Sequence, residues 1–143
     1  MILHAGLIAQ YQAGRWRGVL IEGPSGCGKS DLALRAMAAG WSLVADDRTL
    51  VWASGGRVFG RAAPALAGLI EVRGLGVVAT PARDFAPIDL VVRCVAADAV
   101  ERMPENQARD LLETAIPQID LAAREASAPA KLACAVWRLG LRP

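Results

Sequence analysis

A phosphate-binding signature, G-x-x-x-x-G-K-[ST], constrains this chain more than any other feature. Its eight positions are filled without a mismatch by Gly23, Pro24, Ser25, Gly26, Cys27, Gly28, Lys29 and Ser30. The glycines let successive backbone N–H groups turn toward an anion, and the helix that follows adds its positive N-terminal end. Lys29 can reach the outer phosphates, and the hydroxyl of Ser30 suits a magnesium ion. We therefore predict a nucleoside triphosphate with its Mg²⁺ on residues 23–30, called the phosphate loop below.

The sequence around the phosphate loop favours binding over a chance match. The apolar run 18–21 before it is typical of a buried strand, and residues 31–37 after it have the apolar spacing of a helix. Strand, loop and helix form the context that the signature requires. Lys29 is one of only two lysines, whereas fourteen of the sixteen basic residues are arginine. The composition of the chain therefore does not account for a lysine at this position.

Length and composition exclude several classes of protein. With 143 residues, 54% of them apolar, we expect one domain over residues 1–143. The net charge of +2 is spread along the chain, which does not indicate nucleic acid as a partner. No apolar run approaches the ~18 residues of a membrane span. Cys27, Cys94 and Cys134 are odd in number and far apart, so neither a disulfide framework nor a zinc site is indicated, and we expect a cytoplasmic location.

The pattern of the chain predicts an α/β fold, a kinase-like phosphate-loop domain with a mixed, largely parallel central sheet flanked by helices. Strands are expected at 2–9, 18–21, 41–45 and 88–95, with helices at 30–40 and 127–139. Residues 49–60 read as a hairpin with a Gly55-Gly56 turn. Residues 69–79 read as one strand, and the polar region beyond Pro104 as helical, broken at Pro117.

Four charged residues outside the phosphate loop are candidates for chemistry. Asp46 and Asp47 end the strand predicted at 41–45, which we expect beside the strand of the phosphate loop, so both would lie near the phosphates. Glu71 and Arg73 alternate along the strand predicted at 69–79 and would emerge on one face, either as a functional pair or as an exposed ion pair. His4 is the only histidine, and taken alone it reads as a packing residue.

Missing motifs narrow the class of nucleotide-binding protein. The chain has no N-K-x-D or D-x-x-G segment of a GTPase switch and no L-S-G-G-Q segment of a transporter ATPase. Of the three classes compared, these absences favour a kinase. Two rivals stay open: an ATP-sensing binding module without transfer activity, and a kinase of a small metabolite.

Taken together, the motifs resemble those of the HPr kinase/phosphorylase family. The resemblance is carried by His4, the phosphate loop, Asp46-Asp47-Arg48, and above all Ile70-Glu71-Val72-Arg73-Gly74-Leu75-Gly76, which is similar to that family's signature. It covers residues 4 to 95 well, and the chain looks like the short forms made of the catalytic domain alone. It implies an ATP- and Mg²⁺-dependent kinase that phosphorylates a serine of HPr, a small phosphocarrier protein, and in many members also the reverse phosphorolysis.

The resemblance also implies a role for each candidate. Asp47 would accept the proton of the serine, Lys29 would hold the transferring phosphate, and Ser30 and Glu71 would hold the metal. His4 matches the family's catalytic histidine, which reverses its reading as a packing residue, and Asp46 and Arg73 would be supporting residues. The resemblance further implies a hexamer. The chain departs from the family in lacking a G-R-N segment with its arginine near 117–120. Either Arg124 substitutes for that arginine or no residue does, and we expect a kinase with weak or absent phosphorolysis.

Overall fold

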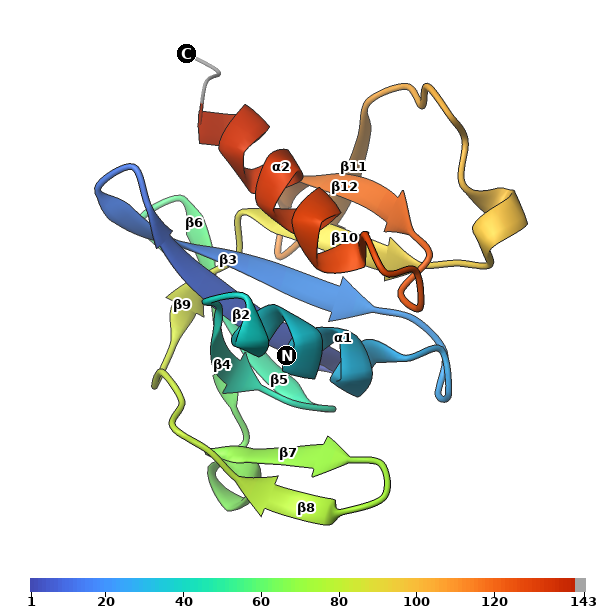
Figure 1. Ribbon diagram of the computed structural model, residues 1–143. Helices are drawn as coiled ribbons and strands as arrows, with labels where there is room; N and C mark the ends of the chain where they lie inside the picture. The colour runs from blue at the N-terminus through green and yellow to red at the C-terminus, as the bar shows by residue number, and fades with distance from the viewer. Residues whose placement is uncertain (141–143) are drawn as a thin grey trace.

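The computed structural model describes residues 1–140 and contains two α-helices and twelve strands in that range (Figure 1). The helices are α1 (Lys29–Ala38) and α2 (Ala128–Gly140), and two 3₁₀ turns, η1 (Pro64–Leu66) and η2 (Ala97–Ala99), lie in loops. The strands are β1 (Ile2–Leu3), β2 (Ala5–Gln12), β3 (Arg15–Glu22), β4 (Ser42–Ala45), β5 (Thr49–Ser54), β6 (Arg57–Ala62), β7 (Leu69–Val72), β8 (Gly76–Ala79), β9 (Ala86–Pro87), β10 (Leu90–Cys94), β11 (Gln107–Leu111) and β12 (Thr114–Leu121).

The prediction of an α/β fold with a largely parallel, helix-flanked sheet is wrong. Strands make up 45% of residues 1–140, and helices, including the 3₁₀ turns, make up 21%. The main sheet has the order β11-β12-β10-β3-β2-β4, and only β12-β10 and β10-β3 are parallel pairs. The other sheets, β1-β5-β6-β9 and β7-β8, are antiparallel throughout. The physical reason is local: short turns join four pairs of consecutive strands as hairpins, where a parallel sheet needs long helical crossovers.

The sequence predicted that β4 lies beside β3, and the structure shows that the two strands do not pair. The whole of β2 lies between them and is antiparallel to both. Because both neighbours run opposite to β2, β3 and β4 still point the same way. Their carboxyl ends therefore lie at the same edge of the sheet. The prediction that Asp46 lies near the phosphate loop is confirmed, although the predicted strand order was wrong.

The region beyond Pro104 forms a hairpin, so its reading as a helix broken at Pro117 is also wrong. Leu112 and Glu113, at the turn between β11 and β12, both have positive φ angles, 48° and 64°. Such a turn normally uses Asn-Gly or Asp-Gly, and here neither residue gives that signal. Pro117 is tolerated because the parallel ladder with β10 begins only at Gln118.

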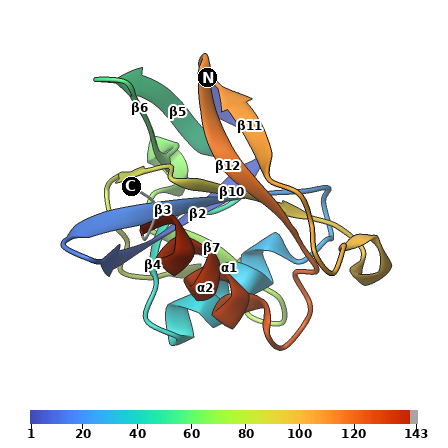
Figure 2. The same cartoon turned by 90° about the horizontal axis from the view of Figure 1, so that it is seen from above.

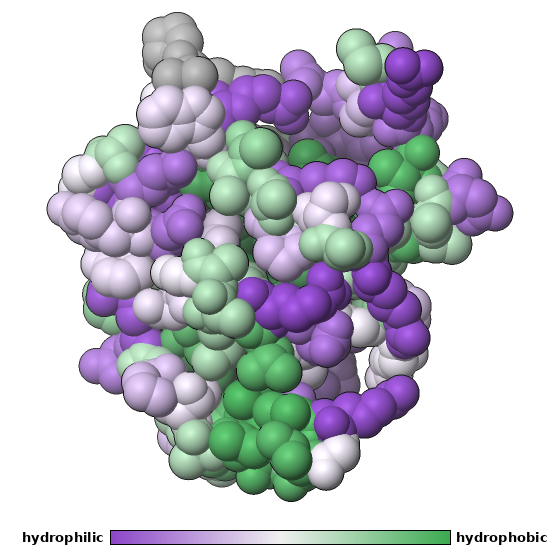
Figure 3. Space-filling model, viewed as in Figure 1, coloured by the Kyte–Doolittle hydropathy of each residue, from purple (hydrophilic) through white to green (hydrophobic). Residues whose placement is uncertain are grey.

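Residues 69–79 form the hairpin β7-β8 rather than one strand. The turn runs through Arg73, Gly74 and Leu75, and Gly74 and Gly76 have positive φ angles of 92° and 94°. The prediction that Glu71 and Arg73 share a strand face is therefore wrong, since Arg73 lies in the turn. The hairpin exposes Leu75 and Val77, and the apolar patch at the foot of the molecule in Figure 3 lies over it.

Other expected elements are confirmed. Helix α1 ends before Gly40, whose φ of 98° is the left-handed geometry expected after a helix. Strands β5 and β6 form the hairpin predicted at 49–60, with Gly55 and Gly56 at positive φ. The closing helix predicted at 127–139 is α2. No helix within residues 1–140 is long and apolar enough to cross a membrane.

The main sheet separates two apolar cores, because its side chains alternate between faces. Both helices pack on one face, where Val19 and Ile21 of β3 meet Leu32 of α1 and Leu132 of α2. The opposite face, represented by Leu20, packs against the β5-β6 sheet. Figure 2 shows this arrangement edge-on, with the helices below the sheet and β5-β6 above it.

Gly18 of β3 provides a test of this packing. A Cβ atom there would lie 1.9 Å from the carbonyl oxygen of Pro87, whereas a Cβ at Gly6 on the neighbouring β2 would meet only Ala45 at 3.5 Å. We expect Gly18→Ala to lower the free energy of unfolding in urea by about 3 kcal/mol or more, because backbone must move. The matched variant Gly6→Ala should change it by less than about 1 kcal/mol. Equal effects would contradict the close approach of residue 87 to β3.

Candidate active site

The phosphate loop connects β3 to α1, as the sequence predicted for its local context. Gly26 and Gly28 adopt left-handed φ angles of 82° and 99°, which side chains disfavour. Gly28 is the N-cap of α1 and no side chain caps the helix. The first N–H groups of α1 therefore have no side-chain acceptor and are available to an anion.

Lys29 folds back over the loop that precedes it. Its Nζ donates to the carbonyl oxygen of Gly23 at 2.6 Å and to that of Pro24 at 3.1 Å. The ammonium group is thereby held against the backbone at the start of the loop. An outer phosphate bound there would meet both the ammonium charge and the helix N-terminus.

The loop rests on a tightly packed base. A Cβ at Gly23 would lie 2.8 Å from the Sγ of Cys27 and 2.9 Å from the Cβ of Cys94, so only glycine fits. Burial, with a smaller contribution from Cys27, raises the pKa of Cys94 to about 12. Its thiol therefore stays protonated at neutral pH and acts as packing beneath the loop.

Asp46 connects the phosphate loop to the β7-β8 hairpin. Its Oδ1 accepts a hydrogen bond from the Oγ of Ser30 at 2.7 Å, and its Oδ2 accepts one from the backbone N–H of Glu71 at 3.0 Å. The residue is only 7% exposed. A buried carboxylate needs such donors, and here they join three segments that are distant in the sequence.

Asp47 occupies a strained turn beside this junction. The backbone N–H of Arg48 donates to the carbonyl oxygen of Asp46 at 2.7 Å, and Asp47 between them has a φ of 67°. This is a γ-turn of the rare positive-φ kind, and such strain is concentrated at functional sites. The turn directs the side chain of Asp47 to solvent, where it is 58% exposed.

His4 lies next to Asp47. Its Nδ1 is 3.8 Å from Oδ1 of Asp47, and the side chain is 68% exposed. Two ladders cause this approach, because Leu3 pairs with Thr49 and Leu7 pairs with Ala45 on either side. The position of the lone histidine is thus fixed by strand register rather than by burial.

The predicted site residues are not all brought together. The phosphate loop, Asp46 and Glu71 are linked by hydrogen bonds, and His4 faces Asp47. By contrast, no hydrogen bond or ion pair within residues 1–140 joins Arg73 to them. Nor does this range contain a group of three or more His, Cys, Asp or Glu side chains suited to holding a metal.

The donors present nevertheless fit Mg²⁺. Ser30, Asp46 and Glu71 offer only oxygen atoms, the ligands that this ion prefers, and Mg²⁺ commonly takes one or two protein oxygens together with phosphate and water. The hydroxyl of Ser30 and the backbone N–H of Glu71 both donate to the Asp46 carboxylate, so the three residues lie close together. Ser30 and Glu71 are the residues that would hold the ion.

Two arginines near the loop make contacts that the sequence analysis did not predict. Arg109 of β11 makes two hydrogen bonds, of 3.0 and 3.2 Å, with the carboxylate of Glu22 just before the loop, which offsets a negative charge there. This contact raises the pKa of Arg109 further above its usual value. Arg35 of α1 donates to the carbonyl oxygens of Ala123 and Glu125. These contacts join β11 to the end of β3, and α1 to the segment after β12. Because the partners are far apart in the sequence, no local sequence signal predicts the contacts.

Arg124 also reaches the phosphate loop. It lies in the segment between β12 and α2, and its Nη2 donates to the carbonyl oxygen of Gly26, 98 residues away in the sequence. A Cβ at Gly28 would meet the Cγ of Arg124 at 3.4 Å. Arg124 therefore covers one side of the loop.

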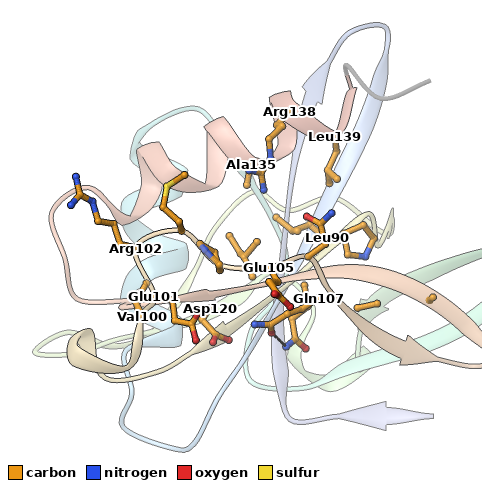
Figure 4. A pocket seen from close by; sticks show the side chains of 18 residues that line it. Leu90, Val100, Glu101, Arg102, Glu105, Gln107, Asp120, Ala135, Arg138 and Leu139 are labelled. Carbon is orange, nitrogen blue, oxygen red and sulfur yellow. Dashed lines mark hydrogen bonds between the residues drawn. The ribbon is translucent and has the colours of Figure 1, made fainter.

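Two cavities of similar volume lie on the described part of the chain. One, of about 540 Å³, is enclosed by the loop 100–107, β12 and α2, and its lining shares no residue with the phosphate loop (Figure 4). The other, of about 530 Å³, is lined by Pro24 and Cys27 of the phosphate loop together with residues 94–97 and 122–125. Only the second adjoins the candidate site.

Comparison with known proteins agrees with this geometry. The model of the HPr serine kinase C-terminal domain family matches residues 2–138. The chain belongs to this family. It is 35% identical over 112 residues to an HPr kinase/phosphorylase of Streptococcus thermophilus, and 40% identical over 89 residues to one of Neisseria meningitidis. These alignments cover 73% and 57% of this chain but only 34% and 28% of the relatives, so the chain spans about a third of their length.

A solved structure shows the same fold. The Hpr(Ser) kinase/phosphatase from Coxiella burnetii superposes with a TM-score of 0.84 over 99% of this chain and 97% of the other, at 21% sequence identity. The two chains therefore share the mostly β arrangement described above.

The junction at Asp46 can be tested by stability. Asp46→Ala should lower the free energy of unfolding by about 2–4 kcal/mol, because a part-buried hydroxyl and a part-buried backbone N–H lose a charged acceptor. Asp46→Asn keeps the shape and one acceptor oxygen, so its loss should be smaller. Urea unfolding followed by tryptophan fluorescence measures both. An Asp46→Ala midpoint equal to that of the wild type would show that the two bonds do not hold the junction.

Proposed function

We propose that this chain transfers the γ-phosphate of ATP to a serine of a small HPr-type phosphocarrier protein. The observation that carries the proposal is the Asp46 carboxylate, which ties Ser30 of the phosphate loop to Glu71 and sets Asp47 beside them. Phosphoryl transfer needs positioning and charge neutralisation more than covalent chemistry. A phosphate loop next to exposed and buried carboxylates supplies the first requirement, and the cationic Lys29 contributes to the second.

In this proposal the residues divide the work. The phosphate loop and Lys29 bind and orient the triphosphate, while Ser30 and Glu71 hold Mg²⁺, which neutralises charge on the phosphates when bound. Asp47 orients the serine hydroxyl and accepts its proton at a carboxylate oxygen. Asp46 fixes Ser30 and the hairpin, and His4, which lies between β1 and β2, faces Asp47. Arg73, in the exposed turn of β7-β8, is a supporting residue.

The exposure of the site favours a protein substrate over a small metabolite. Asp47 is 58% exposed and His4 68%, so the proton acceptor is open to a serine carried on another folded surface. A metabolite kinase must enclose its substrate to keep water out. An ATP-sensing module would not need a carboxylate held in a strained turn, since that strain is retained only where something depends on it.

A hexameric assembly and a cytoplasmic location are further predictions for this chain. The exposed apolar residues Leu75 and Val77 on the hairpin give a surface on which a hexamer or a protein substrate could bury apolar area. We also expect a cytoplasmic location, because the three widely spaced cysteines do not indicate a disulfide framework.

The direct test is intact-mass spectrometry of an HPr-type carrier after incubation with this protein, ATP and Mg²⁺. We expect one added phosphate that maps to serine, and a loss of rate of at least about a hundredfold in Asp47→Asn, which keeps the size of the side chain but cannot accept the proton. ATP binding, measured by calorimetry, should be retained in the variant. Carrier left unmodified by a wild-type protein that binds ATP would favour the sensing module.

The reverse reaction should be weak or absent. Phosphorolysis joins inorganic phosphate to the phosphoryl group of phosphoserine, giving pyrophosphate and free serine. Its nucleophile is an anion that the phosphoryl group repels, whereas the nucleophile of the kinase reaction is a neutral hydroxyl. The chain lacks the G-R-N segment and its arginine, which would neutralise charge on the attacking phosphate. Pyrophosphate release from phosphoserine carrier should therefore run far below the forward rate. Equal rates in the two directions would contradict the expectation.

A further inference from the structure

The cavity beside the phosphate loop has a place in the sheet that points to its use. It opens at the carboxyl ends of the three strands that run parallel, β3, β10 and β12. Pro24 and Cys27 line it from the loop after β3, residues 94–97 from the end of β10, and residues 122–125 from the end of β12. Ligands of parallel sheets bind in the crevice outside the carboxyl ends of the strands.

The position of the acidic residues fixes which end of a nucleotide this cavity can receive. In the sheet order β12-β10-β3-β2-β4, the phosphate loop leaves from β3, and Asp46 and Asp47 follow β4, two strands away on one side. The cavity lies on the other side, toward β10 and β12, which at ~4.8 Å per strand is up to ~10 Å from β3. A triphosphate with its reacting end at the aspartates has its nucleoside end on the cavity side.

The lining suits a base and ribose rather than further phosphate. Most of it is small and apolar, with alanine at 96, 97, 122 and 123 and with Pro24 and Val95. The carboxylate of Glu125 is paired with Lys131 at 2.6 Å, which reduces its repulsion of the triphosphate. A volume of about 530 Å³ lies within the range of small-molecule sites.

Arg124 supplies a polar group at the loop side of the cavity. One of its nitrogen atoms is held by the carbonyl oxygen of Gly26, which orients the guanidinium group and leaves its other donors unused by that bond. A planar guanidinium stacks on aromatic rings and donates to ring and ribose acceptors. The cavity thus combines an apolar wall with one oriented planar cation.

From this geometry we propose that the cavity bounded by the phosphate loop, residues 94–97 and residues 122–125 binds the base and ribose of the nucleoside triphosphate, with Arg124 against the base. The proposal rests on the proposed function only in taking a nucleoside triphosphate as the ligand. In this proposal, residues 94–97 and 122–125 provide the affinity for the nucleoside, and they have no role in the transfer of the phosphoryl group.

The test compares ATP with tripolyphosphate, which offers the phosphate loop the same charged groups without the nucleoside. Isothermal titration calorimetry in Mg²⁺ should find ATP binding at least about tenfold tighter, a difference of about 1.4 kcal/mol. Ala97→Trp fills the cavity from an exposed position and should bring ATP down to the affinity of tripolyphosphate while leaving tripolyphosphate unchanged. Ala96→Trp provides a second substitution from the same wall, and thermal melts check that each variant is folded.

The matched control is Ala108→Trp, an exposed alanine in the lining of the remote cavity, which should change neither affinity. ATP binding that is unchanged in folded Ala97→Trp and Ala96→Trp would overturn the base site while leaving the phosphate loop and the proposed kinase intact. An equal loss for ATP and tripolyphosphate would also overturn it, since the substitution would then act on the loop. A wild-type protein that binds neither ligand would refute the proposed function itself.

Discussion

The candidate site depends on one buried carboxylate. Asp46 is shielded from water, and its two oxygens are satisfied by Ser30 from the phosphate loop and by the backbone of Glu71 from the β7-β8 hairpin. An unpaired buried carboxylate costs several kcal/mol, so these segments must keep their places for the chain to stay folded. The hydrogen bonds of the Asp46 carboxylate therefore fix the phosphate loop, the end of β4 and the β7-β8 hairpin relative to one another. The neighbouring Asp47 gains its position from the same junction while staying exposed.

A second constraint is the insertion of β2 between β3 and β4. It converts what would be a parallel neighbour pair into two antiparallel ones and carries His4 to the edge where the phosphate loop and the aspartates lie. Thr49 reinforces the arrangement, because its hydroxyl donates to the carbonyl oxygen of Ala5 at 2.8 Å in a buried position. The site is thus assembled at one sheet edge by strands of both directions. The parallel strands β10 and β12 extend this edge on the opposite side of the loop, which separates the reactive end of the site from the neighbouring cavity.

Sequence reasoning found local features well and long-range ones poorly. The phosphate loop, the end of α1 near Gly40 and the hairpin at 49–60 were predicted because short motifs with a physical cause mark each of them. The β11-β12 hairpin was missed because its turn is formed by Leu112 and Glu113, which carry no turn signal although both have positive φ. Residues 69–79 were read as one strand because their apolar pattern continues through the turn at Gly74. The prediction of the fold class was wrong for the same reason. Where a turn was not recognised, consecutive strands were not predicted to form a hairpin, and the sheet was predicted to be largely parallel.

By itself the sequence determined the chemistry that is available: a loop that can hold phosphate, a lysine in the one position where the motif needs it, paired aspartates after a strand, and a family signature around Glu71. Such features depend on neighbours within a few residues, where spacing fixes geometry. Only the tertiary structure decided which of them meet. It joined Asp46 to Ser30, brought His4 to Asp47, left Arg73 apart in a turn, and placed Arg124 on the loop from 98 residues away. Those outcomes depend on strand order and register, which arise from the packing of the whole chain and are not written in any single segment.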